Sequence, residues 1–253
     1  MKIENIKIAL CFSGQIRTGI LTSNNIKNFI GDLVNQCDVF VHTWDIISQT
    51  TPDLNIAGVP FKEPDSLFEE FSEIWKPKKM VVDNFINWQE QRIQIEPLFY
   101  SLYQCDKFRK EYQKEKNLIY HFVIKIRPDF IYNPSYKLKD ELEVILNSDY
   151  GNSIYTLDFG NVISLNKFED VFWIAHTDVF DIAVNYYFER LGTNECDWQT
   201  EMAEYLRKNN IKYKRLYLGN EGIPYRWSNL YEQNRTVEDY EMNWKKYFFN
   251  LPY

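Results

Sequence analysis

The sequence predicts an α/β domain in which a mostly parallel sheet is flanked by helices. The first half alternates short apolar strand patterns with helical patterns, which is typical of strand–helix–strand units. The chain has 253 residues, of which 45% are hydrophobic and 26% charged, enough for one large domain of ordinary globular composition. Neither an internal repeat nor a clear linker divides it, so we expect residues 1–253 to form a single domain.

Each element of the first half follows from a local pattern. Short β-branched apolar runs predict strands, and apolar residues three and four apart predict helices. In chain order they are a strand at 6–12, a helix at 23–34 capped by Ser23 or Asn24, a strand at 37–44, a loop at 45–66, a helix at 67–75, a strand at 79–83 and a helix at 97–116 opened by Pro97.

The next strand ends in an unusual polar step. Val123, Ile124 and Ile126 predict a buried strand, and Pro128 bounds it between Arg127 and Asp129. We therefore expect these two charged residues where a core strand reaches the surface. Ligands of open α/β sheets bind outside the carboxyl ends of strands, where a cation and an anion can hold a phosphate and a metal or sugar hydroxyl. A plain Arg–Asp pair capping the strand is the alternative, and both stay open here.

The second half is less regular and resembles an elaboration of the same domain. Its apolar runs and helical spacings are shorter, and turn residues separate them. The predicted elements are strands at 153–157, 161–165, 170–175 and 211–218, a helix at 177–191 capped by Thr177, and a helix at 194–209.

Charge and cysteine usage exclude several classes of protein. The net charge is −7 and no block of Lys and Arg occurs, which excludes a general nucleic-acid binder but allows a small phosphorylated ligand. Cys11, Cys37, Cys105 and Cys196 lack the paired spacing of a zinc or redox motif. The start lacks a signal peptide, and no apolar run of about 18 residues occurs. We expect a cytoplasmic protein without a transmembrane segment; peripheral membrane contact stays open.

Polar residues also follow the first strand. Ser13, Gly14, Gln15 and Arg17 form a segment in which the glycine allows a tight turn and close approach of a ligand. Backbone N–H groups and the arginine can take a phosphate. The segment is no P-loop and no G-x-G-x-x-G motif, so a simple turn is the alternative.

The second strand ends in His42 and Trp44. The histidine can bind a ligand or support the structure, and the tryptophan can stack on a base or close the core. Since the carboxyl ends of parallel strands meet at one edge, we expect the three polar strand ends to converge on one crevice.

Four segments, taken in order, resemble a family. Residues 8–17, 37–44, 97–103 and 123–129 are similar to small glycosyltransferases of bacterial capsule and lipopolysaccharide gene clusters and of large viruses. The resemblance covers residues 5–135 and continues more faintly to residue 215.

The resemblance implies a GT-A fold, a Rossmann-like sheet that binds a nucleotide-sugar donor. Residues 1–135 would bind the nucleotide sugar and residues 136–253 would form the acceptor side. In that fold a mid-chain strand ends in a D-x-D-like motif that faces the diphosphate through a divalent metal. Here Arg127 replaces the first carboxylate, leaving Asp129 as the expected ligand of Mn²⁺ or Mg²⁺. Metal independence stays open, because Arg127 can contact the diphosphate directly.

The same resemblance implies transfer of a sugar to a glycan or lipid-linked acceptor. An inverting enzyme needs a carboxylate that deprotonates the acceptor hydroxyl, and we select Asp170 and Glu201 ahead of Asp158 and Asp197. Retention and inversion both stay open. Two other functions stay open: a sulfo- or phosphotransferase acting on polysaccharide, and a non-catalytic carbohydrate- or nucleotide-binding module.

Overall fold

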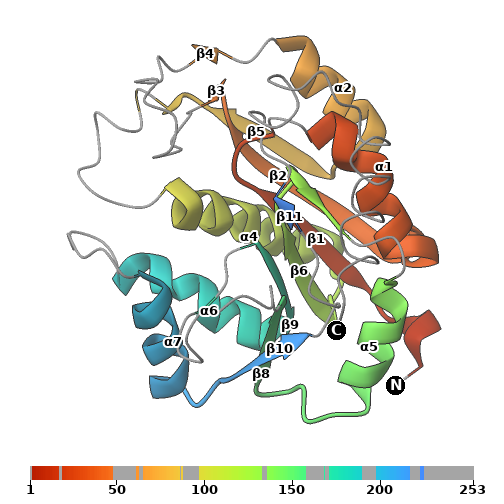
Figure 1. Ribbon diagram of the computed structural model, residues 1–253, viewed down its shortest axis with the longest axis vertical. Coiled ribbons are helices and arrows are strands. Elements are labelled where there is room, and N and C mark those ends of the chain that lie inside the picture. Colours follow the sequence, from red (N-terminus) through yellow and green to blue (C-terminus); the bar gives the residue numbers. More distant parts are fainter. Residues whose placement is uncertain are drawn as a thin grey trace, which may run out of the picture.

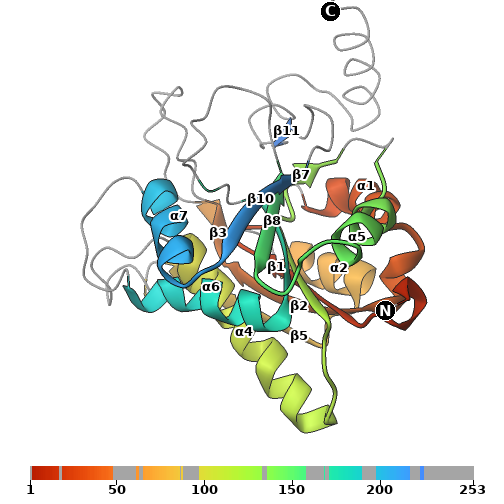
Figure 2. The same ribbon diagram turned by 90° about the horizontal axis from the view of Figure 1, so that it is seen from below.

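A seven-stranded sheet lies between two layers of helices (Figures 1 and 2). The structure, a computed structural model, describes residues 2–16, 19–47, 61–62, 65–85, 87, 97–132, 136–157, 168, 171–189, 198–216 and 223–224. The strands of the sheet are β1 (Ile8–Ser13), β2 (Cys37–Trp44), β5 (Lys79–Asp83), β6 (Phe122–Ile126), β8 (Ser153–Leu157), β9 (Phe172–His176) and β10 (Lys212–Leu216). The helices are α1 (Gly19–Ile30), α2 (Asp65–Trp75), α4 (Pro97–Lys116), α5 (Leu138–Leu146), α6 (Thr177–Glu189) and α7 (Trp198–Lys208).

The strand order is β10-β8-β9-β6-β1-β2-β5. Strand β9 runs antiparallel to its neighbours β6 and β8, whereas the other pairs in this sheet are parallel. The predicted fold class, an α/β domain with a mostly parallel sheet flanked by helices, is confirmed. Short elements complete it: the 3₁₀ helices η1 (Ile3–Asn5) and η2 (Gly31–Gln36), and the strand pairs β3 (Ile46–Ile47) with β4 (Phe61–Lys62) and β7 (Phe130–Ile131) with β11 (Ile223–Pro224).

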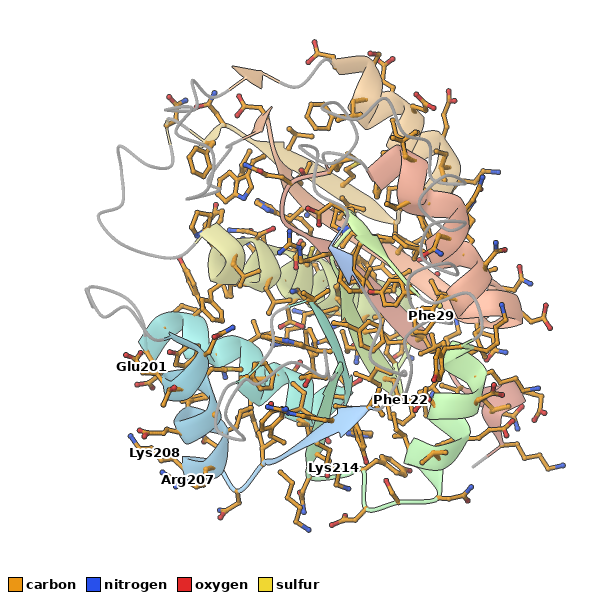
Figure 3. The ribbon with its side chains drawn as sticks, in the orientation of Figure 1. Phe29, Phe122, Glu201, Arg207, Lys208 and Lys214 are labelled. Atoms are coloured by element: carbon orange, nitrogen blue, oxygen red, sulfur yellow. The ribbon has the colours of Figure 1, made fainter. Side chains whose placement is uncertain are left out.

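Each face of the sheet carries its own apolar core. The central strands β1 and β6 are buried on both faces, so their side chains alternate between the two cores. One core packs α1, α2 and α5 on the sheet, and includes Phe29 and Phe122 (Figure 3). The other packs α4 and α6 on the opposite face and includes Leu102, Cys105 and Phe180.

The chain order places a switch point between β1 and β6. The chain adds β2 and β5 on one side of β1, with α1 and α2 on one face, and then passes along α4 on the other face to β6 on the other side of β1 (Figure 1). At such a point the connections leave the two central strands in opposite directions, which opens a crevice at their carboxyl ends.

Several element predictions hold and others are corrected. The elements at 37–44, 79–83, 97–116 and 153–157 have the predicted bounds. Helix α1 begins at Gly19 instead of Ser23, whose hydroxyl donates back to the Gly19 carbonyl. The expected loop at 45–66 contains β3 and β4, helix α5 was not predicted, and the predicted strand at 161–165 lies outside the described residues.

In the part of the chain that the structure describes, no helix has the length and apolar character needed to cross a bilayer.

Candidate functional site

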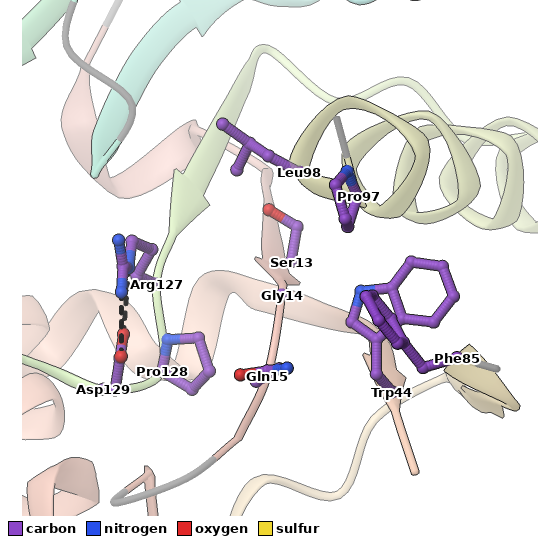
Figure 4. Close-up of a pocket in the computed structure, with 10 residues that line it drawn as sticks. All are labelled: Ser13, Gly14, Gln15, Trp44, Phe85, Pro97, Leu98, Arg127, Pro128 and Asp129. Carbon is purple, nitrogen blue, oxygen red and sulfur yellow. Dashed lines mark hydrogen bonds and ion pairs between the residues drawn. The ribbon is translucent and has the colours of Figure 1, made fainter. Parts of the chain in front are cut away.

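A pocket of about 150 Å³ lies at the switch point, at the carboxyl ends of β1, β2 and β6 (Figure 4). Its lining brings together the polar ends of three strands and the start of α4: Ser13, Gly14, Gln15, Trp44, Phe85, Pro97, Leu98, Arg127, Pro128 and Asp129. The predicted convergence of the three strand ends on one crevice is therefore confirmed. Figure 4 shows the Arg–Asp pair and the aromatic side chains on opposite sides of Gly14 and Gln15.

Arg127 and Asp129 form a two-pronged ion pair on one side of the pocket. Arg127 Nε donates to Asp129 Oδ1 at 2.9 Å, and Nη2 donates to Oδ2 at 2.8 Å. Asp129 is 1% exposed, so the expectation that it lies at the surface is wrong. The arginine side chain keeps 20% exposure. A parallel fork of this kind fixes the plane of the guanidinium.

The turn that carries this pair is held against α1. Thr22 donates its hydroxyl to the Pro128 carbonyl. A Cβ at Gly19 would meet Pro128 Cβ at 3.1 Å, so a glycine allows the helix to approach the proline this closely. The Arg127 N–H donates to Val171 O at 3.2 Å. Contacts on both sides therefore fix the position of the ion pair.

The floor of the pocket is the turn after β1. Gly14 has φ +110°, a conformation that residues with a side chain rarely adopt. Its N–H donates to Ser101 Oγ at 2.7 Å, so this N–H is already used within the protein. Ser13 Oγ is buried and has no hydrogen-bond partner among the described residues. A buried hydroxyl without a partner costs free energy.

The wall opposite the ion pair is aromatic. Trp44 and Phe85 meet edge to face, with ring centroids 5.3 Å apart. Tyr100 stacks on the other side of Trp44 at 5.4 Å and 29°. Pro97 and Leu98, the first residues of α4, complete this wall. Trp44 itself is 1% exposed, so it closes the core and presents very little surface to the pocket.

His42 lies beneath the pocket rather than in its lining. Its ring is 0% exposed and both nitrogens have partners, Ser101 Oγ at 3.0 Å from Nδ1 and Asp83 Oδ2 at 3.1 Å from Nε2. Burial lowers the pKa of His42, and its hydrogen bond with Asp83 opposes that effect. His42 can therefore act on a ligand only through the residues above it.

Glu201, another predicted site residue, is not among the residues that line the pocket. Glu201 lies on α7, where its Oε2 accepts a hydrogen bond from the Tyr186 hydroxyl at 3.0 Å (Figure 3). Arg17 and Asp170 lie outside the described residues, as do Asp158 and Asp197.

The described residues of this pocket do not provide the set of oxygen ligands that a divalent cation needs. Mn²⁺ and Mg²⁺ are held by several oxygen ligands, commonly two carboxylates. Asp129 is the carboxylate in the lining, and both of its oxygens accept hydrogen bonds from Arg127. Across the described ranges, no group of three or more His, Cys, Asp or Glu side chains is placed to hold a metal ion.

Some pocket residues were not predicted from the sequence. Phe85 stands just after the third strand and Trp44 ends the second, so the place of Phe85 beside a strand end was a usable signal. Pro97 and Leu98 were assigned to a helix start and not to a site. Ser101 and Asp83 carried no signal, because their contacts with His42 join segments far apart in the sequence.

Comparisons with known proteins give likenesses of structure only. No protein-family model matches the chain, and no characterised protein matches its sequence. A cytidylyltransferase from Leptospira borgpetersenii has 13% identity and a TM-score of 0.44, with 98% of this chain and 89% of that one covered. Mouse xyloside xylosyltransferase 1 has 6% identity and a TM-score of 0.42, with 83% and 84% covered.

Two further likenesses are to larger proteins. The glycosyltransferase GlyE of Streptococcus pneumoniae has 13% identity and a TM-score of 0.42, with 83% of this chain and 45% of that one covered. TarS of S. aureus has 11% identity and a TM-score of 0.45, with 83% of this chain and 35% of that one covered. Likenesses this distant give no residue of this chain a role.

Proposed function

We propose that this protein is a GT-A-type glycosyltransferase that moves a sugar from a nucleotide-sugar donor to a glycan or lipid-linked acceptor. One observation supports the proposal most: an arginine held by a buried carboxylate faces an aromatic wall across a glycine turn, at the switch point of a parallel sheet. Such a site offers a cation for phosphate and an aromatic wall, in which Phe85 is partly exposed, for a base or a sugar.

The dimensions and polar groups of the pocket suit part of a donor. A volume of about 150 Å³ accommodates one pyrimidine or one sugar ring, so the remainder of a donor would extend along the rim. Arg127, whose side chain is 20% exposed, would contact the diphosphate with its guanidinium.

The chemistry requires positive charge beside the leaving group. Glycosyl transfer passes through an oxocarbenium-like state, and negative charge develops on the departing diphosphate. Arg127 is the cation that lines the pocket, so we assign it the stabilisation of that charge. Asp129 positions the arginine. We keep Asp170 and Glu201 as proposed carboxylates for the acceptor hydroxyl, on the acceptor side formed by residues 136–253.

A divalent metal is not needed for this assignment. With Asp129 committed to Arg127, binding of Mn²⁺ or Mg²⁺ would require the ion pair to open. We therefore propose metal-independent binding of the diphosphate by Arg127, in an enzyme that works in the cytoplasm.

A thermal-shift screen tests the proposed function. The ligands are UDP, GDP, CDP and 3′-phosphoadenosine 5′-phosphate, each with Mn²⁺ and with EDTA. One nucleoside diphosphate at about 100 times its Kd should stabilise the protein by about 2.7 kcal/mol, which raises Tm by about 5–10 °C, with EDTA present as well.

Each other outcome has a defined meaning. Stabilisation by 3′-phosphoadenosine 5′-phosphate alone would replace the proposal with a sulfotransferase. A shift that appears only with Mn²⁺ would show that the Arg–Asp pair opens to admit a metal. Binding of a nucleoside diphosphate without any transfer or hydrolysis of the matching nucleotide sugars would leave a binding module.

A further inference from the structure

A hydrogen-bonded network lies directly under the pocket and joins four elements of the fold. His42 of β2 contacts Ser101 of α4 and Asp83 of β5 through its two ring nitrogens, at 3.0 and 3.1 Å. Ser101 Oγ accepts the N–H of Gly14, in the turn after β1, at 2.7 Å. Tyr100 of α4 donates its hydroxyl to Asp83 Oδ2 at 2.9 Å. A displacement of the His42 ring would therefore be transmitted to the pocket floor through the side chain of Ser101.

The donors and acceptors fix the direction of the network. The hydrogen bond from His42 lowers the pKa of Asp83, so its carboxylate is ionised and only accepts. The hydrogen of the neutral histidine is then on Nε2, and the lone pair of Nδ1 accepts the Ser101 hydroxyl. Ser101 in turn accepts the Gly14 N–H with its own lone pair. The His42 carbonyl, 3.0 Å from Ser101 Oγ, is the competing acceptor for that hydroxyl.

These residue types also occur in hydrolase triads, but the arrangement differs from one. In a Ser-His-Asp triad the serine faces Nε2 and the carboxylate faces Nδ1, and here the two are exchanged. Ser101 and His42 are both 0% exposed, so no substrate reaches the serine oxygen. Nucleophilic catalysis by Ser101 is excluded on both grounds, and a role in support of the pocket remains.

We propose that His42 and Ser101 are positioning residues that hold the turn Ser13–Gln15 in the shape that receives the donor nucleotide. The inference rests on the proposed function. The backbone of Gly14 has φ +110°, which is one of several conformations that a glycine can adopt. Hydrogen bonds to the backbone must therefore select this conformation. The Gly14 N–H donates hydrogen bonds to Ser101 Oγ at 2.7 Å and to the His42 carbonyl at 3.2 Å, and these two bonds select the observed conformation. Ser13 and Gln15, on either side, then face the pocket.

Nucleotide affinity separates this role from a merely structural one. Calorimetric titration with the nucleoside diphosphate that stabilises the wild type should show about 3- to 10-fold weaker binding for Ser101→Ala, and the KM for the donor should rise by the same factor with kcat within about 2-fold. The matched control is Leu102→Val, the next residue of α4, which is 1% exposed and has no part in the network. It should lower Tm and leave the affinity unchanged.

The possible results distinguish failure of the inference from failure of the function. A Ser101→Ala variant that binds the nucleotide as tightly as Leu102→Val would overturn the inference alone. A wild type that binds no nucleoside diphosphate would overturn the proposed function.

The tautomer of His42 gives a second test, which is measured on the wild type and uses a His42 variant only to assign the signal. The chain has three histidines, so long-range ¹H–¹⁵N spectra of the free protein contain few imidazole signals, and His42→Asn identifies the one from His42. The network requires a neutral ring protonated at Nε2 at pH 7. Protonation at Nδ1 would reverse the direction of the Ser101 bond and contradict the inference.

Discussion

Arg127→Ala is expected to lower sugar transfer by about 100- to 1,000-fold, the usual loss when one preorganised donor to developing charge is removed. The guanidinium is the cation of the pocket lining, and Asp129 holds its plane by two hydrogen bonds of 2.9 and 2.8 Å. Steady-state kinetics with the matching nucleotide sugar measure the effect. Arg127→Lys should restore only part of it, since an ammonium group cannot form the same fork.

The ion pair also contributes to stability, so the fold must be checked in parallel. Arg127→Ala leaves the 1%-exposed Asp129 carboxylate without the guanidinium, which costs about 3 kcal/mol. Replacing both partners, with Arg127→Met and Asp129→Leu, should recover most of that stability, because no buried charge is left. This double variant should remain inactive. Transfer that persists in it, or in a folded Arg127→Ala, would remove Arg127 from the mechanism.

The sequence predicted the elements whose patterns are local. The strand at 37–44 and the helix at 97–116 have the predicted bounds, because a buried parallel strand is a short apolar run and Pro97 marks a helix start. The missed helix α5 had the signal too, with Leu138, Leu142 and Ile145 at helical spacing and all 0% exposed. Strands β7 and β11 have two residues each, too few for any period.

The sequence predicted which strand ends come together at the site, but not the hydrogen bonds that connect the residues around it. The carboxyl ends of parallel strands lie at one edge of the sheet. Because Gly14, Trp44 and Arg127 stand at such strand ends, the sequence alone could place them together. The burial of Asp129 and the two partners of His42 depend on contacts between distant segments. No local pattern encodes those contacts, and so the sequence left the role of His42 open between ligand binding and support of the structure.

Arg109→Ala is expected to cause the largest loss of stability among single substitutions on α4, about 3–5 kcal/mol. Arg109 is 1% exposed and bonds the 2%-exposed Asp106, with Nε at 2.8 Å from Oδ1. It also pairs with Asp181 of α6 and donates to Gln113 at 2.9 Å. The substitution leaves Asp106 buried without its main counter-charge and removes one ion pair between α4 and α6.

The neighbouring Lys110 provides the matched control. Its ammonium lies 2.7 Å from Asp106 Oδ2 and 3.4 Å from Asp181 Oδ1, but the side chain is 44% exposed. Water screens such a pair, so Lys110→Ala should cost about 1 kcal/mol or less. Urea unfolding at pH 7 measures both values. Helix α4 supplies Pro97 and Leu98 to the pocket and Ser101 to the network beneath it. Arg109→Ala should therefore also weaken nucleotide binding, because it loosens that helix. Equal losses for the two variants would mean that charge on α4, and not burial of the Arg109–Asp106 pair, sets the stability of this layer.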